Sequence, residues 1–341
     1  MIKLSLAKSY IPDELVSLLD ELYNKDDLFD SNYLVSAILS ARICHSKLYP
    51  VQLIEDDVYF NSNEKARLFL QKLYNLNHFS VFAHVISKPI TFNLKNNKEY
   101  INFLLLSSIY KTYFYIDKQS NIGYIRLNLR HILEYEYFYK NIKDNSKYLE
   151  KLFNNFDINI AKNKYIVKTG KCINFNISCN VEDKHQVLKI EDKYSVPVKD
   201  LKFATIFVSD MSRCSTRQLL RHNFTFIERS QRYVKLDKNA DYIVPPSLDD
   251  CSVDIHRMFA DVIDEAIDVY NKLVVNFDIP KEDARYVLPN AICTVIGITF
   301  TYEEAKDFVE KRIIPAAQWE IRRLAKFIKE EVLRWLKILK N

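Results

Sequence analysis

The stretch LKFATIFVSDMSRCSTRQLLRH, residues 201–222, changes structural period near its middle. Its first part, LKFATIFVSD (201–210), is a nearly continuous run of apolar and β-branched residues, which predicts a strand. Ser212 then precedes apolar residues at helical spacing, and serine is a favoured N-cap residue, so the second part predicts a helix. The chain therefore passes directly from strand to helix here, and the densest group of charged residues follows.

The rest of the chain is organised on either side of this stretch. Apolar periodicity predicts helices at 11–25, 32–46, 64–77, 254–276, 281–299, 302–312 and 315–339, and a strand within 85–94. Residues 93–200 are rich in Asn, Lys and Tyr, with predicted helices near 100–116 and 127–154 and strand-like runs at 164–168, 173–179 and 187–190. We interpret 93–200 as an inserted subdomain of unknown role, and a structural elaboration without chemistry is its simplest interpretation.

Composition limits the class of protein. Of 341 residues, 48% are hydrophobic and 27% are charged, the balance of a soluble globular protein. Only 3 glycines are present, so a glycine-rich phosphate loop is excluded and a nucleotide would have to be held by side chains and helix ends. No apolar run is long enough to span a bilayer and no secretory signal opens the sequence, so we expect no membrane partner and a cytoplasmic location.

The cysteines and histidines give no sign of a metal site. The six cysteines form no CxxC pair and no zinc-type cluster, so we expect reduced thiols and no bound metal. His78 and His84 flank a short loop, HFSVFAH, that also contains Ser80, but no further ligand lies nearby in sequence. No cysteine is marked by its surroundings as a nucleophile.

The strongest chemical signal is RQLLRHNFTFIERSQRY, residues 217–233, where four arginines surround a histidine, a glutamate and a serine. Guanidinium groups bind phosphate through paired charge-assisted hydrogen bonds, and the formal net charge of +5 suits an anionic small ligand. The alternatives are a solvated basic helix face and a nucleic-acid-binding surface with interleaved aromatic residues. The mild net charge argues against nucleic acid as a partner.

A second signal is AAQWEIRRLA, residues 316–325, with Arg312 upstream and Arg285 opening the earlier segment ARYVLP. Taken alone, Gln318, Glu320 and Arg322 are typical of a helix surface with i, i+4 partners. The residues by themselves do not choose between this interpretation and a binding site.

Four motifs in order resemble those of the flavin-dependent thymidylate synthases. They are SARICHS (40–46), EKARLFLQKLYNLNHFSVFAH (64–84), RHNFTFIERSQRY (221–233) and the long block ARYVLPNAICTVIGITFTYEEAKDFVEKRIIPAAQWEIRRLA (284–325). The resemblance covers roughly 1–92 and 201–341. It implies an α+β fold with a central, mostly antiparallel sheet and long helices, in which 1–92 and 201–341 form one discontinuous catalytic domain interrupted by 93–200.

The resemblance also implies an activity and its small molecules. The family makes dTMP from dUMP, with FAD as hydride carrier, methylenetetrahydrofolate as carbon donor and NADPH as reductant, and uses no cysteine nucleophile. It implies a homotetramer with one FAD per subunit and sites shared between subunits.

Individual roles follow from the matching positions. Arg312 matches the arginine that activates dUMP by stabilising the ionised uracil N3, which would make it the catalytic residue. The substrate-binding matches, with arginines chiefly at the phosphate, are Gln218, Arg221, Glu228, Ser230, Arg232, Arg285 and Arg312. The matches on the flavin and folate side are His78, Ser80, Arg221, His222 and Glu228.

Departures from the family pattern lie mainly on the flavin side. The signature reads RHN with Asn223 in place of its second arginine, and it is one residue short before Ser230. An NAR triplet is replaced by Thr301, Tyr302 and Glu303, which reverses a charge, and Asp307 is a further change. The sequence therefore leaves open an alternative: a catalytically degenerate relative that binds dUMP or serves as a structural subunit.

Overall fold

The structure is a computed structural model of an α+β protein. It describes residues 12–25, 27–172, 186–192, 194, 196, 201–238 and 240–333, with the backbone only at 167–172, 186, 187 and 191. The chain divides into two compact units, each described by itself below. Unit 1 contains Met1–Ser40, Ile54–Ile166 and Ile190–Ala204, and unit 2 contains Ala41–Leu53, Val167–Lys189 and Thr205–Asn341.

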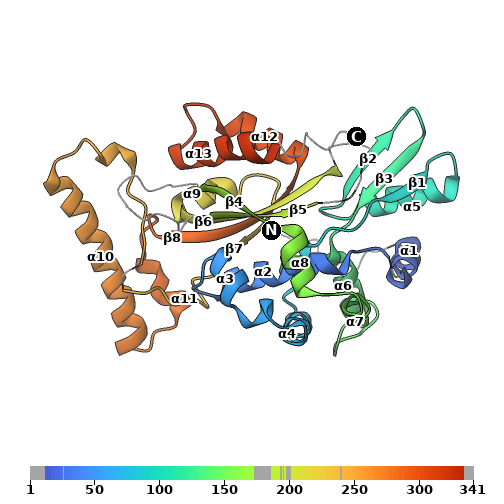
Figure 1. The fold of residues 1–341 in the computed structure, drawn as a ribbon, viewed down its shortest axis with the longest axis horizontal. Helices are drawn as coiled ribbons and strands as arrows, with labels where there is room; N and C mark the ends of the chain where they lie inside the picture. The colour runs from blue at the N-terminus through green and yellow to red at the C-terminus, as the bar shows by residue number, and fades with distance from the viewer. Residues whose placement is uncertain are drawn as a thin grey trace. The chain divides into compact units, whose positions relative to one another are not determined.

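Unit 1 combines helices with a small antiparallel sheet (Figure 1). The sheet has the order β1-β3-β2, from β1 (Ile90–Asn93), β2 (Tyr113–Asp117) and β3 (Ile122–Arg126). Gly123 is required in β3 because a Cβ atom there would lie 2.6 Å from the Phe103 ring. The helices are α1 (Asp13–Asn24), α2 (Leu34–His45, whose last turns belong to unit 2), α4 (Asn63–Asn75), α5 (Asn97–Ser107), α6 (Leu129–Phe138), α7 (Lys147–Phe153) and α8 (Ile158–Tyr165).

Two predicted helices in this region are wrong in extent. The helix expected over 100–116 ends at Ser107, and β2 follows it; Lys111 between them has a φ of 62°, which a helix does not allow. The helix expected over 127–154 is two helices, α6 and α7. Asn141 and Asn145 lie between them with φ of 54° and 59°, and such left-handed residues end a helix.

Unit 2 is built on a five-stranded sheet of order β4-β5-β6-β8-β7. The strands are β4 (Ile166–Cys172), β5 (Gln186–Glu191), β6 (Phe203–Ser212), β7 (Thr225–Glu228) and β8 (Cys293–Thr301). β7 pairs antiparallel with β8, and every residue of β6 is buried, as expected for a strand inside a sheet. The predicted strand run at 173–179 lies outside the described residues.

The helices of unit 2 carry most of the predicted site. They are α3 (Pro50–Asp56, which begins in this unit), α9 (Arg213–Leu219), α10 (Val253–Asn276), α11 (Lys281–Ala284), α12 (Tyr302–Arg312) and α13 (Trp319–Phe327). Figure 1 shows α12 and α13 along the sheet that contains β6 and β8. The predicted strand at 201–210 and the helices at 212–222, 254–276 and 302–312 are confirmed, with small differences at their ends.

The helix expected over 281–299 is wrong. Only Lys281–Ala284 is α-helical, and the β-branched run TVIGIT inside Cys293–Thr301 forms β8, whose last eight residues are buried. β-Branched side chains favour a buried strand over a helix, and here that preference prevails over the apolar spacing. The helix expected over 315–339 begins at Trp319 and passes into a π-helical turn, Ile328–Val332; residues 334–341 are outside the described part.

Candidate functional site

The junction of β6 and α9 positions the first group of site residues. Ser212 is the N-cap of α9, and its side chain accepts a hydrogen bond from the Ser215 N–H at 3.1 Å. Glu320 from α13 accepts from both the backbone N–H and the hydroxyl of Ser212, each at 2.6 Å. Glu320 is only 1% exposed, so its assignment to a helix surface is wrong: this carboxylate anchors α9 to α13.

Arg213 and Glu228 form the next part of the site. Arg213 Nη1 lies 2.9 Å from Glu228 Oε2, and each of the two side chains is 20% exposed. Burial lowers the pKa of Arg213, and the neighbouring Glu228 carboxylate opposes that change. The other carboxylate oxygen, Glu228 Oε1, is buried and has no hydrogen-bond partner among the described residues. Glu228 is therefore a carboxylate fixed by the arginine, with its second oxygen enclosed by the protein.

Arg312 and His222 bring two of the sequence motifs together. Arg312 Nε donates to His222 Nε2 at 2.8 Å, although the residues are 90 positions apart. Burial, followed by the Arg312 charge, lowers the pKa of His222 to about 4, so the ring is neutral near pH 7 and can accept this hydrogen bond. This bond uses Nε and leaves the two terminal nitrogens of the Arg312 guanidinium outside it.

Arg232 and Arg285 meet at a third residue, Glu282. Arg232 Nε donates to Glu282 Oε2 at 2.7 Å, and Arg285 Nε donates to the Glu282 carbonyl oxygen at 3.1 Å. The Arg232–Glu282 ion pair is about half exposed, and the carboxylate raises the pKa of Arg232. Arg285 is also close enough to Arg213 to lower that arginine's pKa, which places this pair beside the Arg213–Glu228 pair.

The remaining predicted residues of unit 2 lie around these pairs. Gln218 is on α9, and its carbonyl accepts from the Arg221 N–H at 3.3 Å. Arg221 is exposed, and its side chain has no partner among the described residues. The Ser230 N–H donates to the Cys44 carbonyl at 3.1 Å, and the Ser230 hydroxyl accepts from the Arg232 N–H at 3.2 Å.

His78 and Ser80 lie in unit 1. His78 precedes the 3₁₀ segment Phe79–His84, which contains Ser80, and Ser80 is exposed. His84, the second histidine of this loop, is buried, and its burial lowers its pKa to about 3. It is therefore a neutral core histidine. Across the part of the chain that the structure describes, no cluster of His, Cys, Asp or Glu could hold a metal.

The positions that depart from the family pattern have local structural partners. Thr301 is the N-cap of α12 and forms a reciprocal capping box with Glu304. Asn223 Nδ2 donates to Glu304 Oε1 at 3.1 Å, and Lys306 lies 3.9 Å from Glu303. The changed residues therefore stabilise the start of α12, and the reversed charge at Glu303 is offset by a neighbouring lysine.

A cavity of about 220 Å³ lies in the same unit. Ser230 is the only predicted site residue on its wall. Several residues that the sequence did not single out also line it: Lys47, Tyr49, Asp210, Arg213, Lys235, Asp237, Asp241, Cys293 and Thr294, together with Arg229 from the basic cluster. Arg213 directly follows the Ser212 cap, a position that could have drawn attention to it, whereas Tyr49 and Asp210 have no sequence signal.

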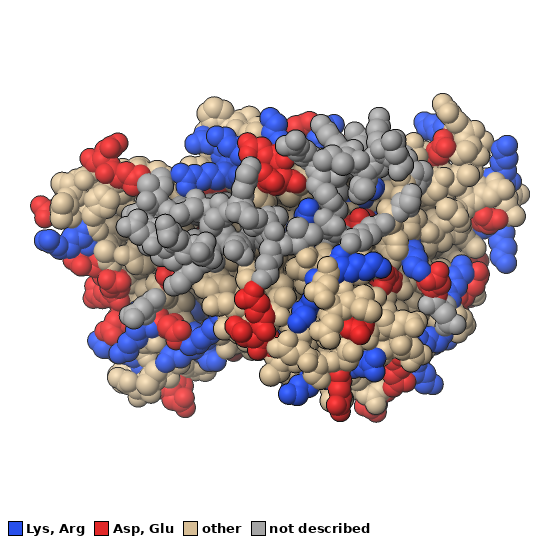
Figure 2. All heavy atoms as spheres, in the orientation of Figure 1, with Lys and Arg blue, Asp and Glu red and all other residues tan. Residues whose placement is uncertain are grey.

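Surface charge and the environment of one thiol bear on two other kinds of site. Figure 2 shows acidic and basic side chains interspersed among the described residues of the visible face. Burial raises the pKa of the Cys44 thiol, which disfavours the thiolate form of a nucleophile. In the described residues, no helix is both long and apolar enough to cross a membrane.

Comparison with known proteins points to one family. Residues 197–336 match the family described as "Thymidylate synthase complementing protein". The flavin-dependent thymidylate synthase of Pyrococcus furiosus is 32% identical over 147 residues, which are 39% of this chain and 59% of that protein. The enzyme of the same name from Sulfolobus acidocaldarius is 36% identical over 135 residues, 38% of this chain and 49% of that protein.

The relative from Clostridium tetani, also a flavin-dependent thymidylate synthase, is 33% identical over 152 residues, 40% of this chain and 60% of that protein. The chain thus spans about half to three fifths of the length of the curated relatives it matches. A solved structure of thymidylate synthase X from Helicobacter pylori with FAD and dUMP has a TM-score of 0.31 and 19% identity, covering 38% of this chain and 66% of that chain. A TM-score this low supports no argument.

Proposed function

Because residues 197–336 carry the sequence of the thymidylate synthase complementing family, we propose that this chain is an FAD-dependent thymidylate synthase that makes dTMP from dUMP. The observation that carries the proposal is the 2.8 Å hydrogen bond from Arg312 to His222. It joins the arginine signature to the C-terminal block inside one unit, as a shared pocket requires. The carbon donor would be methylenetetrahydrofolate and the reductant NADPH.

The dUMP site would be built from two pairs of side chains, Arg232 with Arg285 and Arg213 with Glu228. Arg232 and Arg285 are near the surface and close together, a suitable arrangement for a phosphate with two negative charges. The partly exposed Glu228 carboxylate, held in place by Arg213, would accept from a sugar hydroxyl, and the Ser230 hydroxyl would contact the nucleotide beside it. Gln218 and Arg221 would complete the binding set from α9 and the turn that follows it.

Arg312 would carry the catalytic charge. Its Nε is fixed by a neutral histidine, so the guanidinium is oriented without losing its positive charge to an ion pair. A fixed cation beside uracil N3 stabilises the anion that develops on the ring, which is the usual electrostatic contribution to such reactions. His222 would therefore hold Arg312 in place as well as contact the flavin.

The residues present fit an anionic cofactor. Arg217 and Arg221 are exposed guanidiniums without side-chain partners among the described residues, as an FAD pyrophosphate would need. Bound FAD would supply hydride transfer. His78 and Ser80 are proposed to contact the flavin as well, and 93–200 is proposed to be an inserted subdomain. We further propose a homotetramer in the cytoplasm, with sites shared between subunits.

The test is spectroscopic and then catalytic. Purified protein incubated with FAD should retain a yellow flavin, and its visible spectrum should change when dUMP is added. The protein should then release tritium from 5-labelled dUMP in a reaction that depends on FAD and NADPH. Colourless protein that takes up no FAD would refute the proposal.

The charge reversal at Glu303 favours a second candidate, a catalytically degenerate relative that binds dUMP or serves as a structural subunit. This candidate predicts dUMP binding without tritium release. Release of tritium at a rate dependent on FAD would exclude it.

A further inference from the structure

The small sheet of unit 1 has two edges, and they differ in how they are protected. Its order is β1-β3-β2, so β1 and β2 are both edge strands. The backbone N–H and C=O groups of an edge strand can pair with another chain, and proteins normally protect such edges. β1 is four residues long and follows Pro89, and the Asn93 N–H donates to the Glu99 carboxylate at 2.6 Å. These features close the β1 edge to a further strand.

The register shows which backbone groups of β2 point away from the sheet. The Leu94 N–H donates to the Asn121 carbonyl at 2.9 Å, at the end of the β1–β3 pairing. Facing residues in an antiparallel ladder alternate between hydrogen-bonded and non-hydrogen-bonded pairs, so the even-numbered residues of β3 direct their backbone groups to β2. One of them lies opposite Tyr115, which therefore bonds inward. The backbone groups of Phe114 and Ile116 point outward.

The outer edge of β2 lacks the protection found at β1. Phe114 is 52% exposed and Ile116 is 37% exposed, and no described residue forms a hydrogen bond with their outward backbone groups. The strand sequence, YFYID over Tyr113–Asp117, contains no lysine or proline, and its one charge lies at the end. Aromatic and β-branched residues favour strand pairing. This edge is therefore open to a further strand.

An apolar surface adjoins the open edge. α5 packs against β1 and β3 (Figure 1), and its Phe103 ring meets the Phe114 ring edge-on, with the ring centroids 5.9 Å apart. Tyr100 and Leu104 are four residues apart, so they lie on one side of α5, and both are exposed. Apolar side chains gathered beside an unpaired strand are typical of an interface between proteins.

We propose that β2 pairs antiparallel with β2 of a second copy of this chain, which joins the two three-stranded sheets into one sheet of six strands. Placing Tyr115 opposite Tyr115 of the other copy satisfies the outward groups. Phe114 of each copy then forms a hydrogen-bonded pair with Ile116 of the other. A two-fold axis through this point makes the same strand both sides of the interface, as in a symmetric dimer.

The charges of the strand fit this register. Asp117 faces Tyr113 of the other copy, so no like charges lie directly opposite each other. Lys111, two residues before the strand, lies at the end where Asp117 of the other copy arrives. The same complementary arrangement recurs at the other end by symmetry. The pairing gives the region 93–200 a role in assembly, and it does not rest on the proposed activity.

The first test is a disulfide across the two-fold axis. In a non-hydrogen-bonded antiparallel pair the Cα atoms lie about 4.5 Å apart, within the range of about 4.4–6.8 Å that a disulfide spans. Tyr115→Cys in the full chain should therefore form a linked dimer under mild oxidation, seen by non-reducing electrophoresis. Asp117→Cys is the matched control, because its two copies are four residues apart along the strands, about 14 Å. The parent chain, with six cysteines of its own, sets the background.

The second test counts the chains in each particle by sedimentation. Ile116→Pro removes an outward N–H without breaking a hydrogen bond to β3, and Phe114→Lys places a charge at the interface. Each should halve the number of chains per particle relative to the parent, with unchanged thermal unfolding of unit 1. Thr91→Pro is the matched control: its N–H points outward at the protected β1 edge, so the particle should keep its size.

Other results would overturn the proposal. A parent chain that sediments as a monomer would do so, and so would particles of unchanged size in both β2 variants. Equal dissociation by Ile116→Pro and Thr91→Pro would show a disrupted sheet instead of a lost interface. Equal cross-linking of Tyr115→Cys and Asp117→Cys would show random collision. FAD uptake by the same proteins is measured separately, and its absence would refute the proposed function while the pairing of β2 is judged by sedimentation alone.

Discussion

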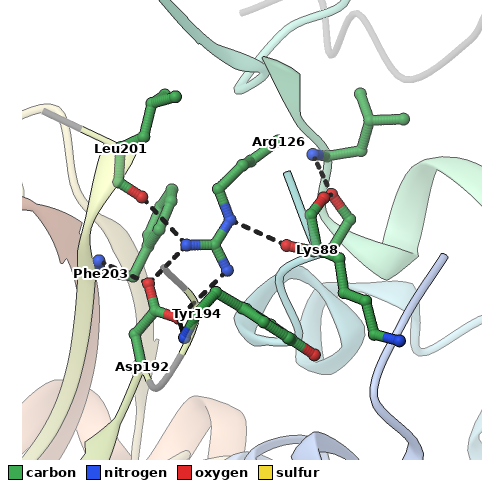
Figure 3. Close-up of polar contacts among 8 residues, drawn as sticks. Lys88, Arg126, Asp192, Tyr194, Leu201 and Phe203 are labelled. Carbon is green, nitrogen blue, oxygen red and sulfur yellow. Dashed lines mark hydrogen bonds and ion pairs between the residues drawn. The ribbon is translucent and has the colours of Figure 1, made fainter. Parts of the chain in front are cut away.

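Two arginine sites, one in each unit, differ in whether their hydrogen bonds are complete. In unit 1, Arg126 is 1% exposed and every nitrogen has a partner (Figure 3). Its Nε donates to the Ser87 carbonyl at 2.8 Å and Nη1 to the Leu201 carbonyl at 2.9 Å, while both terminal nitrogens contact the Asp192 carboxylate. The guanidinium also lies over the rings of Tyr194 and Phe203.

In unit 2 the corresponding network is incomplete. Arg213 and Arg229 are tied to Glu228 and to backbone carbonyls, yet each has an Nε that lacks a partner among the described residues, and both line a cavity. A closed network can only hold the chain together, because nothing in it is left to bind. Buried donors without partners lower stability, so the unit 2 network contributes less to the fold than a complete one would. The comparison therefore assigns a structural role to Arg126, whose network is complete.

The largest expected effect is on stability, from breaking the closed network. Asp192→Ala leaves a buried guanidinium without its counter-ion and should lower the free energy of unfolding by about 3–5 kcal/mol. Urea unfolding followed by circular dichroism measures this loss. The control, Glu21→Gln, removes an exposed i, i+4 partner of Lys25 and should change stability by about 0.5 kcal/mol or less. Similar losses in the two variants would contradict a structural role for Arg126.

Arg312→Ala tests the catalytic role proposed for unit 2. Loss of the fixed cation should lower turnover about a hundredfold or more, the cost of removing one charge-stabilising donor, while FAD binding changes little. Turnover is measured by tritium release and FAD binding by flavin absorbance. Arg312 is half-buried at the end of α12, so the fold should survive, and an unchanged unfolding midpoint would confirm this.

Arg232→Ala should act on binding. This arginine is exposed, and its loss should raise the dissociation constant of dUMP about tenfold, the effect of one charge-assisted contact. Calorimetry measures the change, and Arg257→Ala, at an exposed arginine of α10, serves as control. If Arg232→Ala and Arg312→Ala lost FAD equally, the substrate and catalytic roles would be misassigned.

The helices and strands of the two units can be predicted from the sequence, but the ion pairs between distant residues cannot. The strand and capped helix at 201–222 follow from patterns that are local, and so do α10 and α12. The ion pairs do not, because Arg126 and Asp192 are 66 positions apart and each would be placed on the surface by composition alone. The buried Glu320 was misassigned for the same reason: its partner Ser212 is distant in sequence.

The candidate site likewise contains some residues that the sequence predicts and others that it does not. Motif resemblance singled out His222, Glu228 and Arg312, and the structure gives each of them a partner in unit 2. The resemblance could not find Tyr49 or Asp210, since nothing in their local sequence signals a cavity wall. The φ of 53° at Asp210 depends on tertiary contacts that no short motif encodes.

The smallest effect concerns pH, and it compares two histidines. Both His222 in unit 2 and the buried His131 in unit 1 have pKa values lowered to about 4, mainly by burial. In the unfolded chain each titrates near its ordinary pKa of about 6.5, so the unfolded state binds protons first as pH falls. Stability should be full above about pH 6.5, should decline between pH 6.5 and 4, and should lose no more from these groups below that.

Replacing His222 with Gln separates the two contributions. Gln keeps an acceptor for Arg312 but does not titrate, so the decline in the urea midpoint between pH 6.5 and 4 should become shallower without vanishing, because His131 still contributes. His222 is only half-buried, and solvent screening makes its share the smaller one. An unchanged slope in His222→Gln would mean that the ring takes up its proton over the same pH range in the folded and unfolded chains, so that the folded state does not lower its pKa. A hydrogen bond from Arg312 favours the neutral ring and so lowers its pKa, which means that the contact joining the two motifs would then be absent.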